Sequence, residues 1–212
     1  MNSVSPIESD DAAANSPDAP APANAFTALD IENILREQSW LAERASNDAT
    51  RDDNDARSGG AIPAADSAAL ANWLEEAAAL LGPHAIDRGA LVDLLGLIFR
   101  YDAATTLASA DAQSVIARSG AREVIRELAG QILESGEIRS ERFKEMIDAL
   151  KVATRIRSRE LFHPVRLALA GRAGEGELDR VILLLDSAAK LDFAVHVKGT
   201  RERMLEFCAA LD

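Results

Sequence analysis

The chain has 212 residues, of which 48% are hydrophobic and only 4% aromatic, and its formal net charge is −12 at pH 7. This length suits one moderate domain with a tail, or two small domains. Because aromatic residues are few, the core is expected to be packed mainly with Leu, Ile, Val and Ala. The single cysteine, Cys208, excludes an intrachain disulfide framework and is typical of a reducing compartment. The N-terminus lacks a secretory signal and no apolar run approaches the roughly 18 residues of a membrane span, so we expect a cytoplasmic protein without membrane segments.

The negative charge is concentrated in the first hundred residues. Residues 1–60 hold twelve acids and four arginines, a balance of −8, and residues 61–100 hold five acids and two arginines, a balance of −3. The remaining 112 residues therefore carry only −1. Because phosphate contacts depend on Lys and Arg, the acidity argues against nucleic-acid binding mainly for the N-terminal half.

Residues 1–63 are predicted to form a disordered acidic tail that contains one amphipathic helix. Residues 1–25 are rich in Ala, Asp, Ser, Pro and Asn and lack apolar periodicity, and residues 45–63 have the composition of a flexible linker. Residues 26–44 between them have apolar side chains at largely helical spacing, with Thr27 suited to cap the helix. A helix between two disordered segments must dock to be stable, so we expect its apolar side to bind a partner. The partner-binding candidates are Phe26, Leu29, Ile34 and Trp40.

Residues 64–212 are predicted to form an all-α domain, a helical bundle with connections short enough for antiparallel neighbours. Polar caps and glycines divide it into helices. The expected starts and stops are Asp66 or Ser67, Gly82-Pro83, Asp87, Ser109, Gly120, Ser135-Gly136, Ser140 and Thr200. Residues 177–190 are apolar almost all round, so this helix is expected at the centre of the bundle. The alternation in residues 192–198 is too short for a sheet of its own.

Residues 151–172 reverse the charge of the chain, with six basic residues against a single acid, Glu160. The basic residues are Lys151, Arg155, Arg157, Arg159, Arg166 and Arg172. We expect a basic helix through about Arg157, a break at Phe162-His163-Pro164, and a short helix from Pro164 to Ala170. The stretch is either a solvated helix face that pairs with acids elsewhere or a ridge that contacts phosphates, and charge alone leaves both interpretations open.

No catalytic residue, cofactor or metal site is expected. His84, His163 and His196 are isolated in sequence, and the zinc and calcium patterns His-Glu-x-x-His, Cys-x-x-Cys and the Asp-rich loop are absent. The glycines of residues 171–176 do not follow a strand, and they lack the Gly-Lys-Ser/Thr ending of a phosphate loop. A turn between helices is the better interpretation of this run.

The segment Leu161–Gly171, LFHPVRLALAG, resembles the C-terminal anticodon-binding region of bacterial glutamyl-tRNA synthetases. That region contains, in this order, an apolar pair, a proline, an arginine and an ending of an aliphatic residue, Thr and Gly. Residues 94–133, 141–154, 176–180 and 200–211 are similar to the neighbouring segments, so that the resemblance covers about residues 65–212. Ala170 stands where the family usually has Thr, and Glu175 where a Pro is common.

The resemblance implies a non-catalytic tRNA-binding module in which the six basic residues contact the anticodon stem-loop. The family's activity is glutamate–tRNA ligation, but its catalytic signatures, His-x-Gly-His and Lys-x-Ser-Lys, are not found in this sequence. We therefore expect no glutamate activation by this chain alone. It could be one part of a split ligase, docked through residues 26–44 to a separate catalytic subunit. The alternative is a protein-interaction adaptor that keeps the helical fold without RNA binding, with residues 26–44 as a helix that lies in a partner's groove.

Overall fold

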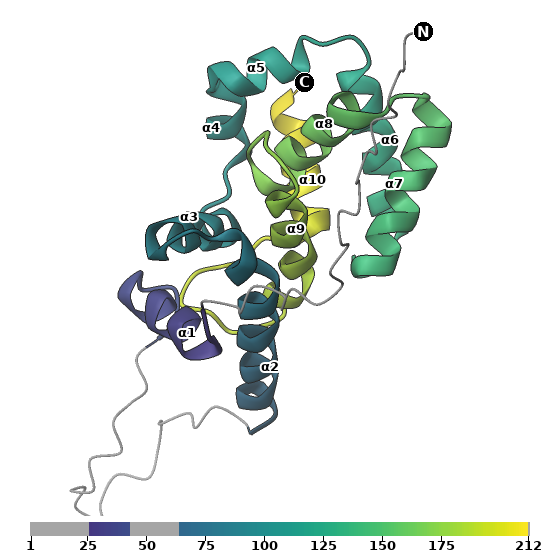
Figure 1. The fold of residues 1–212 in the computed structure, drawn as a ribbon. Helices are drawn as coiled ribbons and strands as arrows, with labels where there is room; N and C mark the ends of the chain where they lie inside the picture. The colour runs from purple at the N-terminus through teal and green to yellow at the C-terminus, as the bar shows by residue number, and fades with distance from the viewer. Residues whose placement is uncertain (1–25, 43–63, 212) are drawn as a thin grey trace, which may run out of the picture.

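The computed structural model describes residues 26–42 and 64–211, and every regular element in these residues is helical (Figure 1). The helices are α1 (Ala28–Glu37), α2 (Ala64–Leu81), the 3-10 turn η1 (Gly82–His84), α3 (Arg88–Phe99), α4 (Ala103–Ala108), α5 (Ala110–Ile116), α6 (Ala121–Glu134), α7 (Ser140–Thr154), α8 (Ser158–Ala170), α9 (Glu177–Ala188) and α10 (Thr200–Leu211). The all-α prediction is confirmed. Residues 1–25, predicted to be disordered, and residues 45–63, predicted to form a linker, lie outside the described residues.

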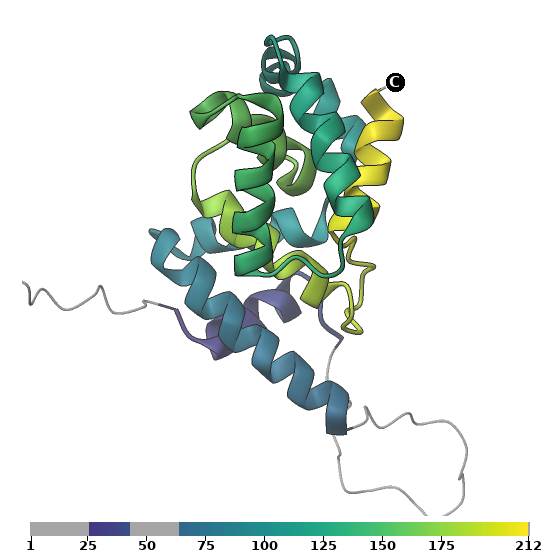
Figure 2. The same ribbon diagram turned by 90° about the vertical axis from the view of Figure 1, so that its right-hand side faces the viewer.

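Helix α9 is the central element, as its nearly uniform apolar surface predicts. Leu178, Val181 and Leu185 are fully buried, and α2, α3, α8 and α10 all contact α9. Figure 1 shows α1, α2 and α3 at one end of the molecule and α4 to α8 at the other, and Figure 2 shows α2 crossing the base of the bundle. None of the helices in the described residues combines the length and apolarity needed to cross a membrane.

Local capping signals place several helix starts where the sequence predicts them. The Asp87 carboxylate accepts from the Ala90 N–H at 2.8 Å to begin α3, and the Ser109 hydroxyl accepts from the Ala112 N–H at 3.2 Å to begin α5. Three predicted starts are wrong. Helix α2 begins at Ala64, upstream of the predicted caps. Ser140 and Thr200 are the first residues of α7 and α10 rather than their caps.

Helix α1 packs into the same hydrophobic core as the rest of the domain, so the predicted amphipathic helix docks on its own chain. Its Ile34 side chain is fully buried and that of Trp40 is 4% exposed. The Trp40 ring stacks on Phe99 with ring centroids 4.7 Å apart, and the Trp73 and Phe193 rings complete an aromatic cluster. Ile34 and Trp40 are therefore not free to bind a partner.

The other two partner-binding candidates are more accessible. Leu29 is 63% exposed, and Phe26 is partly buried against the core. The helix also ends at Glu37, well before the predicted boundary at residue 44. What remains of the predicted docking surface on α1 is thus a single exposed leucine with one partly covered phenylalanine, which weakens the interpretation of this helix as a ligand for another protein.

The break in the basic stretch is at residues 155–157, seven residues before the position predicted for it. Helix α7 ends at Thr154 because Arg155 takes a left-handed conformation, with φ 58°. Helix α8 then runs from Ser158 through Pro164 to Ala170. The proline lacks an N–H for the helix, but its ring is buried among core residues, and this packing offsets the missing bond.

Arg203 of α10 is fully buried and joins three separate segments. Its guanidinium donates to the carbonyl oxygens of Lys198 (2.8 Å), Leu169 (2.8 Å) and Ile98 (2.6 Å) and lies 4.5 Å from the centroid of the Tyr101 ring. Burial lowers the pKa of this guanidinium to about 10, with Tyr101 opposing the shift. The carboxyl ends of α3 and α8 are thereby fixed to α10.

Candidate nucleic-acid interface

Two turns meet beside the start of α8, and they bring basic residues from distant parts of the sequence together. Gly120, between α5 and α6, has φ +86°, and a Cβ built on it would lie 2.4 Å from Cδ1 of Ile156, between α7 and α8. The positive φ favours glycine at this position, and the short distance shows that the two turns are in contact. The turn that carries Arg118 therefore contacts the turn that carries Arg155 and Arg157. We call Arg118, Arg155 and Arg157 the basic elbow.

The three arginines of the basic elbow are exposed, and no carboxylate in the described part of the chain forms an ion pair with any of them. Arg155 owes its outward position to the left-handed backbone that ends α7, and Arg157 is the residue before the first turn of α8. In a chain of net charge −12, this is an unneutralised cluster of guanidinium groups. Such groups bind phosphate oxygens in a bidentate manner.

His163 holds Arg118 at the elbow. Its Nδ1 lies 3.3 Å from Nη1 of Arg118, 45 positions earlier in the sequence, and its Nε2 is buried without a hydrogen-bond partner in residues 26–42 and 64–211. Burial, followed by the charge of Arg118, lowers the pKa of His163. The neutral ring can then accept a hydrogen bond from the guanidinium. Sequence reasoning missed Arg118 because nothing local links it to the basic stretch.

Lys151, Arg159 and Arg172 are the other accessible members of the predicted set. Lys151 pairs with Asp148 at 2.9 Å, and Arg159 pairs with Glu175 at 3.0 Å. Surface pairs of this kind contribute about 0–1 kcal/mol, so a phosphate can displace the carboxylate at low cost. Arg172 is exposed in the turn after α8, and no described carboxylate pairs with it.

Arg166 is the exception among the predicted basic residues, because the structure places it inside the domain. Its side chain is 8% exposed, Nε and Nη2 form a bidentate pair with Asp179 at 2.7 and 2.8 Å, and Nη1 donates to the Gly174 carbonyl at 2.6 Å. The guanidinium also lies 4.9 Å from the Phe162 ring centroid. Arg166 thus fixes the α8–α9 turn to α8, and its burial keeps the guanidinium away from the surface.

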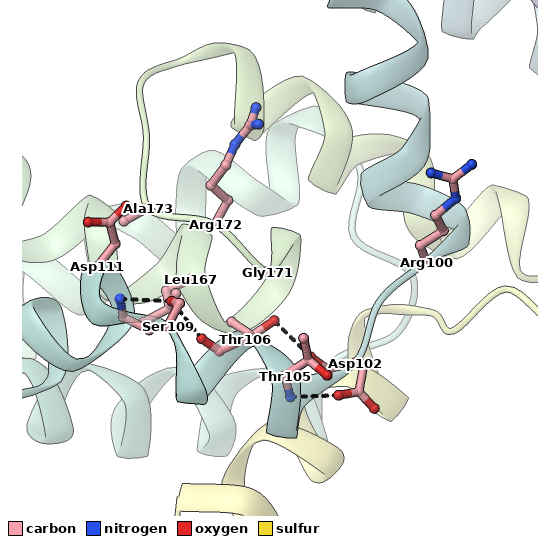
Figure 3. A pocket seen from close by; sticks show the side chains of 11 residues that line it. Arg100, Asp102, Thr105, Thr106, Ser109, Asp111, Leu167, Gly171, Arg172 and Ala173 are labelled. Atoms are coloured by element: carbon pink, nitrogen blue, oxygen red, sulfur yellow. Dashed lines mark hydrogen bonds between the residues drawn. The ribbon is translucent and has the colours of Figure 1, made fainter.

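A groove lies beyond the other end of α8, between the end of α3, helix α4 and the α8–α9 turn. It consists of two adjoining depressions of about 350 and 320 Å³ that share Arg100, Thr106, Gly171 and Arg172. Figure 3 shows Arg100 and Arg172 on opposite sides of this groove, with both side chains extending away from α4. Gly171 has φ +75°, and a Cβ there would lie 3.3 Å from the Thr106 hydroxyl. No group of three or more His, Cys, Asp or Glu side chains in the described ranges could hold a metal ion.

Comparisons with known proteins bear directly on this arrangement. A family model described as an anticodon binding domain matches residues 41–190. Over 93 residues the chain is 33% identical to glutamate–tRNA ligase 2 of Syntrophus aciditrophicus (strain SB), a match that covers 42% of this chain and 19% of that protein. The chain thus aligns with about a fifth of the length of this curated relative. No solved structure matches the chain.

Proposed function

Because the chain belongs to the anticodon-binding domain family, we propose that it is a non-catalytic module that binds tRNA through the basic elbow. The observation that carries this proposal is the exposure of Arg118, Arg155 and Arg157 without carboxylate partners in the described residues. Guanidinium groups on two turns of fixed geometry suit the phosphates of a folded RNA strand, which they position without reading bases. Base recognition in RNA then depends on stacking and hydrogen bonds to unpaired bases.

The neighbouring basic residues extend this surface along α7 and α8. Lys151 lies one turn of α7 before Arg155, and Arg159 lies in the first turn of α8. Their exposed carboxylate partners, Asp148 and Glu175, are the groups that an RNA phosphate would replace. Arg172 adds a cation beyond the end of α8. Arg166 is left out of the proposed surface because it is buried and its charge is paired with Asp179.

A salt titration of tRNA binding tests the proposal. In R155Q/R157Q the slope of log K against log salt is expected to fall by about 2, since each lost phosphate contact removes about 1 from the slope. The matched control is R139Q/K144Q, which removes the same charge at the other end of α7, about 20 Å away. Failure of the wild-type protein to bind tRNA at low salt would refute the proposal. So would equal salt slopes for the two double variants.

The match to a glutamate–tRNA ligase favours a second, finer proposal. In it, the chain supplies the tRNA-binding part of a split glutamate–tRNA ligase whose catalytic part is a separate polypeptide. The buried positions of Ile34 and Trp40 mean that α1 does not dock this subunit through its apolar side. Attachment of glutamate to tRNA, measured with a catalytic fragment alone and after addition of this chain, is the test. A rate that the chain does not change would rule the split ligase out.

A further inference from the structure

We propose that Arg155 is retained at a backbone position that favours glycine because its guanidinium contacts an RNA phosphate. The turn between α7 and α8 is then less stable than it would be with glycine, and RNA binding is what this loss of stability serves. The inference deepens the proposed tRNA binding and rests on it. We call residues 154–158 the strained turn.

The backbone of the strained turn enters the left-handed region twice. Arg155 has φ 58° and Ser158 has φ 54°. In this region the Cβ of an L-residue lies too close to the following carbonyl oxygen, so that glycine is strongly favoured and Asn or Asp is tolerated. At two other helix boundaries with positive φ, Gly120 and Gly171, the chain does use glycine. The strained turn therefore contains two residues at positions where glycine would fit with less strain.

Contacts on both sides hold the strained turn in this conformation. The Thr154 hydroxyl donates to the Leu150 carbonyl at 2.8 Å and accepts from the Ile156 N–H at 3.2 Å. The Ile156 side chain is partly buried and packs against the core. Leu150 in α7 and Leu161 in α8 are fully buried, so the chain must connect two anchored helices within a few residues. The surrounding structure thus fixes the backbone of Arg155 independently of its side chain.

The Arg155 side chain does not offset the strain of its backbone. It is exposed, and its guanidinium has no hydrogen bond, ion pair or aromatic contact within residues 26–42 and 64–211. An arginine also lacks the short polar group with which Asn or Asp stabilises a left-handed residue locally. Its charge suits the carboxyl end of α7, but this interaction is small at an exposed site. A residue that strains its own domain and contacts nothing in it indicates a contact with a ligand.

The position of Arg155 on the strained turn is suited to such a contact. Because the left-handed residue ends α7, Arg155 and Arg157 are carried by the turn itself and extend from a backbone that is fixed at Ile156 between them. A fixed backbone loses less conformational freedom when the ligand binds. Two neighbouring guanidinium groups can each bind phosphate oxygens in a bidentate manner. Glycine at position 155 would relieve the strain but remove one of these two cations.

The test combines thermal denaturation with tRNA binding in R155G and R155Q. R155G removes both the strain and the charge, so its melting temperature is expected to rise by about 1–4 °C. Its tRNA affinity is expected to fall about tenfold and its salt slope by about 1, as for the loss of one phosphate contact. R155Q removes the charge but keeps a side chain on the left-handed residue. It should lose the same affinity without the rise in melting temperature.

S158G and S39G are matched controls for the backbone. Ser158 lies in the same turn, and Ser39 follows α1 with φ 59°, far along the chain from the basic elbow. Both changes relieve a left-handed residue without altering the charge, so both should raise the melting temperature by a similar amount. S39G should bind tRNA within about twofold of the wild type, and S158G should keep the wild-type salt slope.

A melting temperature of R155G at or below that of the wild type would overturn the proposal, because Arg155 would then stabilise the fold. Wild-type tRNA affinity in R155G would overturn it as well. If R118Q/R157Q were still impaired in that case, the proposed function would stand without this contact. A wild-type protein that binds no tRNA would overturn both proposals together.

Discussion

Replacement of Arg203 by Met is expected to destabilise the domain by about 3 kcal/mol. The wild-type guanidinium makes three hydrogen bonds to carbonyls of Lys198, Leu169 and Ile98, at 2.6–2.8 Å, from a fully buried position. Methionine fills much of the same volume but donates nothing. The three carbonyls would then lose their charged donor in a place where little water can replace it.

The magnitude follows from two opposing contributions. Hydrogen bonds to a charged group contribute about 1.5–3 kcal/mol each, or roughly 4–9 kcal/mol for three of them. Burial of the charged guanidinium opposes this gain. It lowers the pKa of Arg203 to about 10, and this shift corresponds to a cost of roughly 3 kcal/mol for removing the charge from water. The difference is about 1–6 kcal/mol, with a central value near 3 kcal/mol.

Urea and thermal denaturation of R203M and of the control R201M would measure this difference. Arg201 is an exposed arginine on the same helix that donates once, to the Leu133 carbonyl at 2.6 Å. A loss of about 3 kcal/mol lowers the melting temperature by roughly 6–12 °C in a domain of this size, whereas R201M should shift it by no more than a few degrees. If R203M melted within two degrees of R201M, the assigned role of the buried guanidinium would be wrong.

Three further predictions concern other parts of the fold. W40A should cost about 3–5 kcal/mol through the lost aromatic packing and should make α1 sensitive to protease, which limited proteolysis detects. D186A should cost about 2–3 kcal/mol in urea denaturation, because that carboxylate accepts the N–H groups of Ile138 and Thr200, both at 2.7 Å. The pKa of His163 is lower in the folded protein than in the unfolded chain, so the unfolded chain binds its proton first. Stability should therefore fall as pH drops below about 6.5 and H163Q should reduce that fall, as pH-dependent melting would show.

Features of the fold that depend on near neighbours could be predicted from the sequence. A side chain such as that of Asp87 or Ser109 caps the N–H three positions later, so the signal lies within four residues. The central place of α9 follows from its own composition, because a helix that is apolar all round must be covered on every side. Neither inference requires knowledge of which other segment lies nearby.

The candidate site depends on contacts that a single sequence does not reveal. Arg157 and Arg166 look alike in the basic stretch, yet Arg166 is buried because Asp179 reaches it from the next helix. The apolar side of α1 indicates that this helix is covered, but not that the cover is its own domain. Arg118 joins the elbow only because the turns at Gly120 and Ile156 meet. Each outcome is decided by tertiary packing.

The hydrogen bond from Ala194 to Trp40, and the aromatic cluster that joins Trp40 to Phe193, have a consequence for synthesis of the protein on the ribosome. About 150 residues separate these partners along the chain. At about 5–20 residues per second, the ribosome takes roughly 8–30 s to add them. The cluster around Trp40 stays incomplete for that period, which makes the newly made N-terminal part a target for chaperones until the last helices emerge.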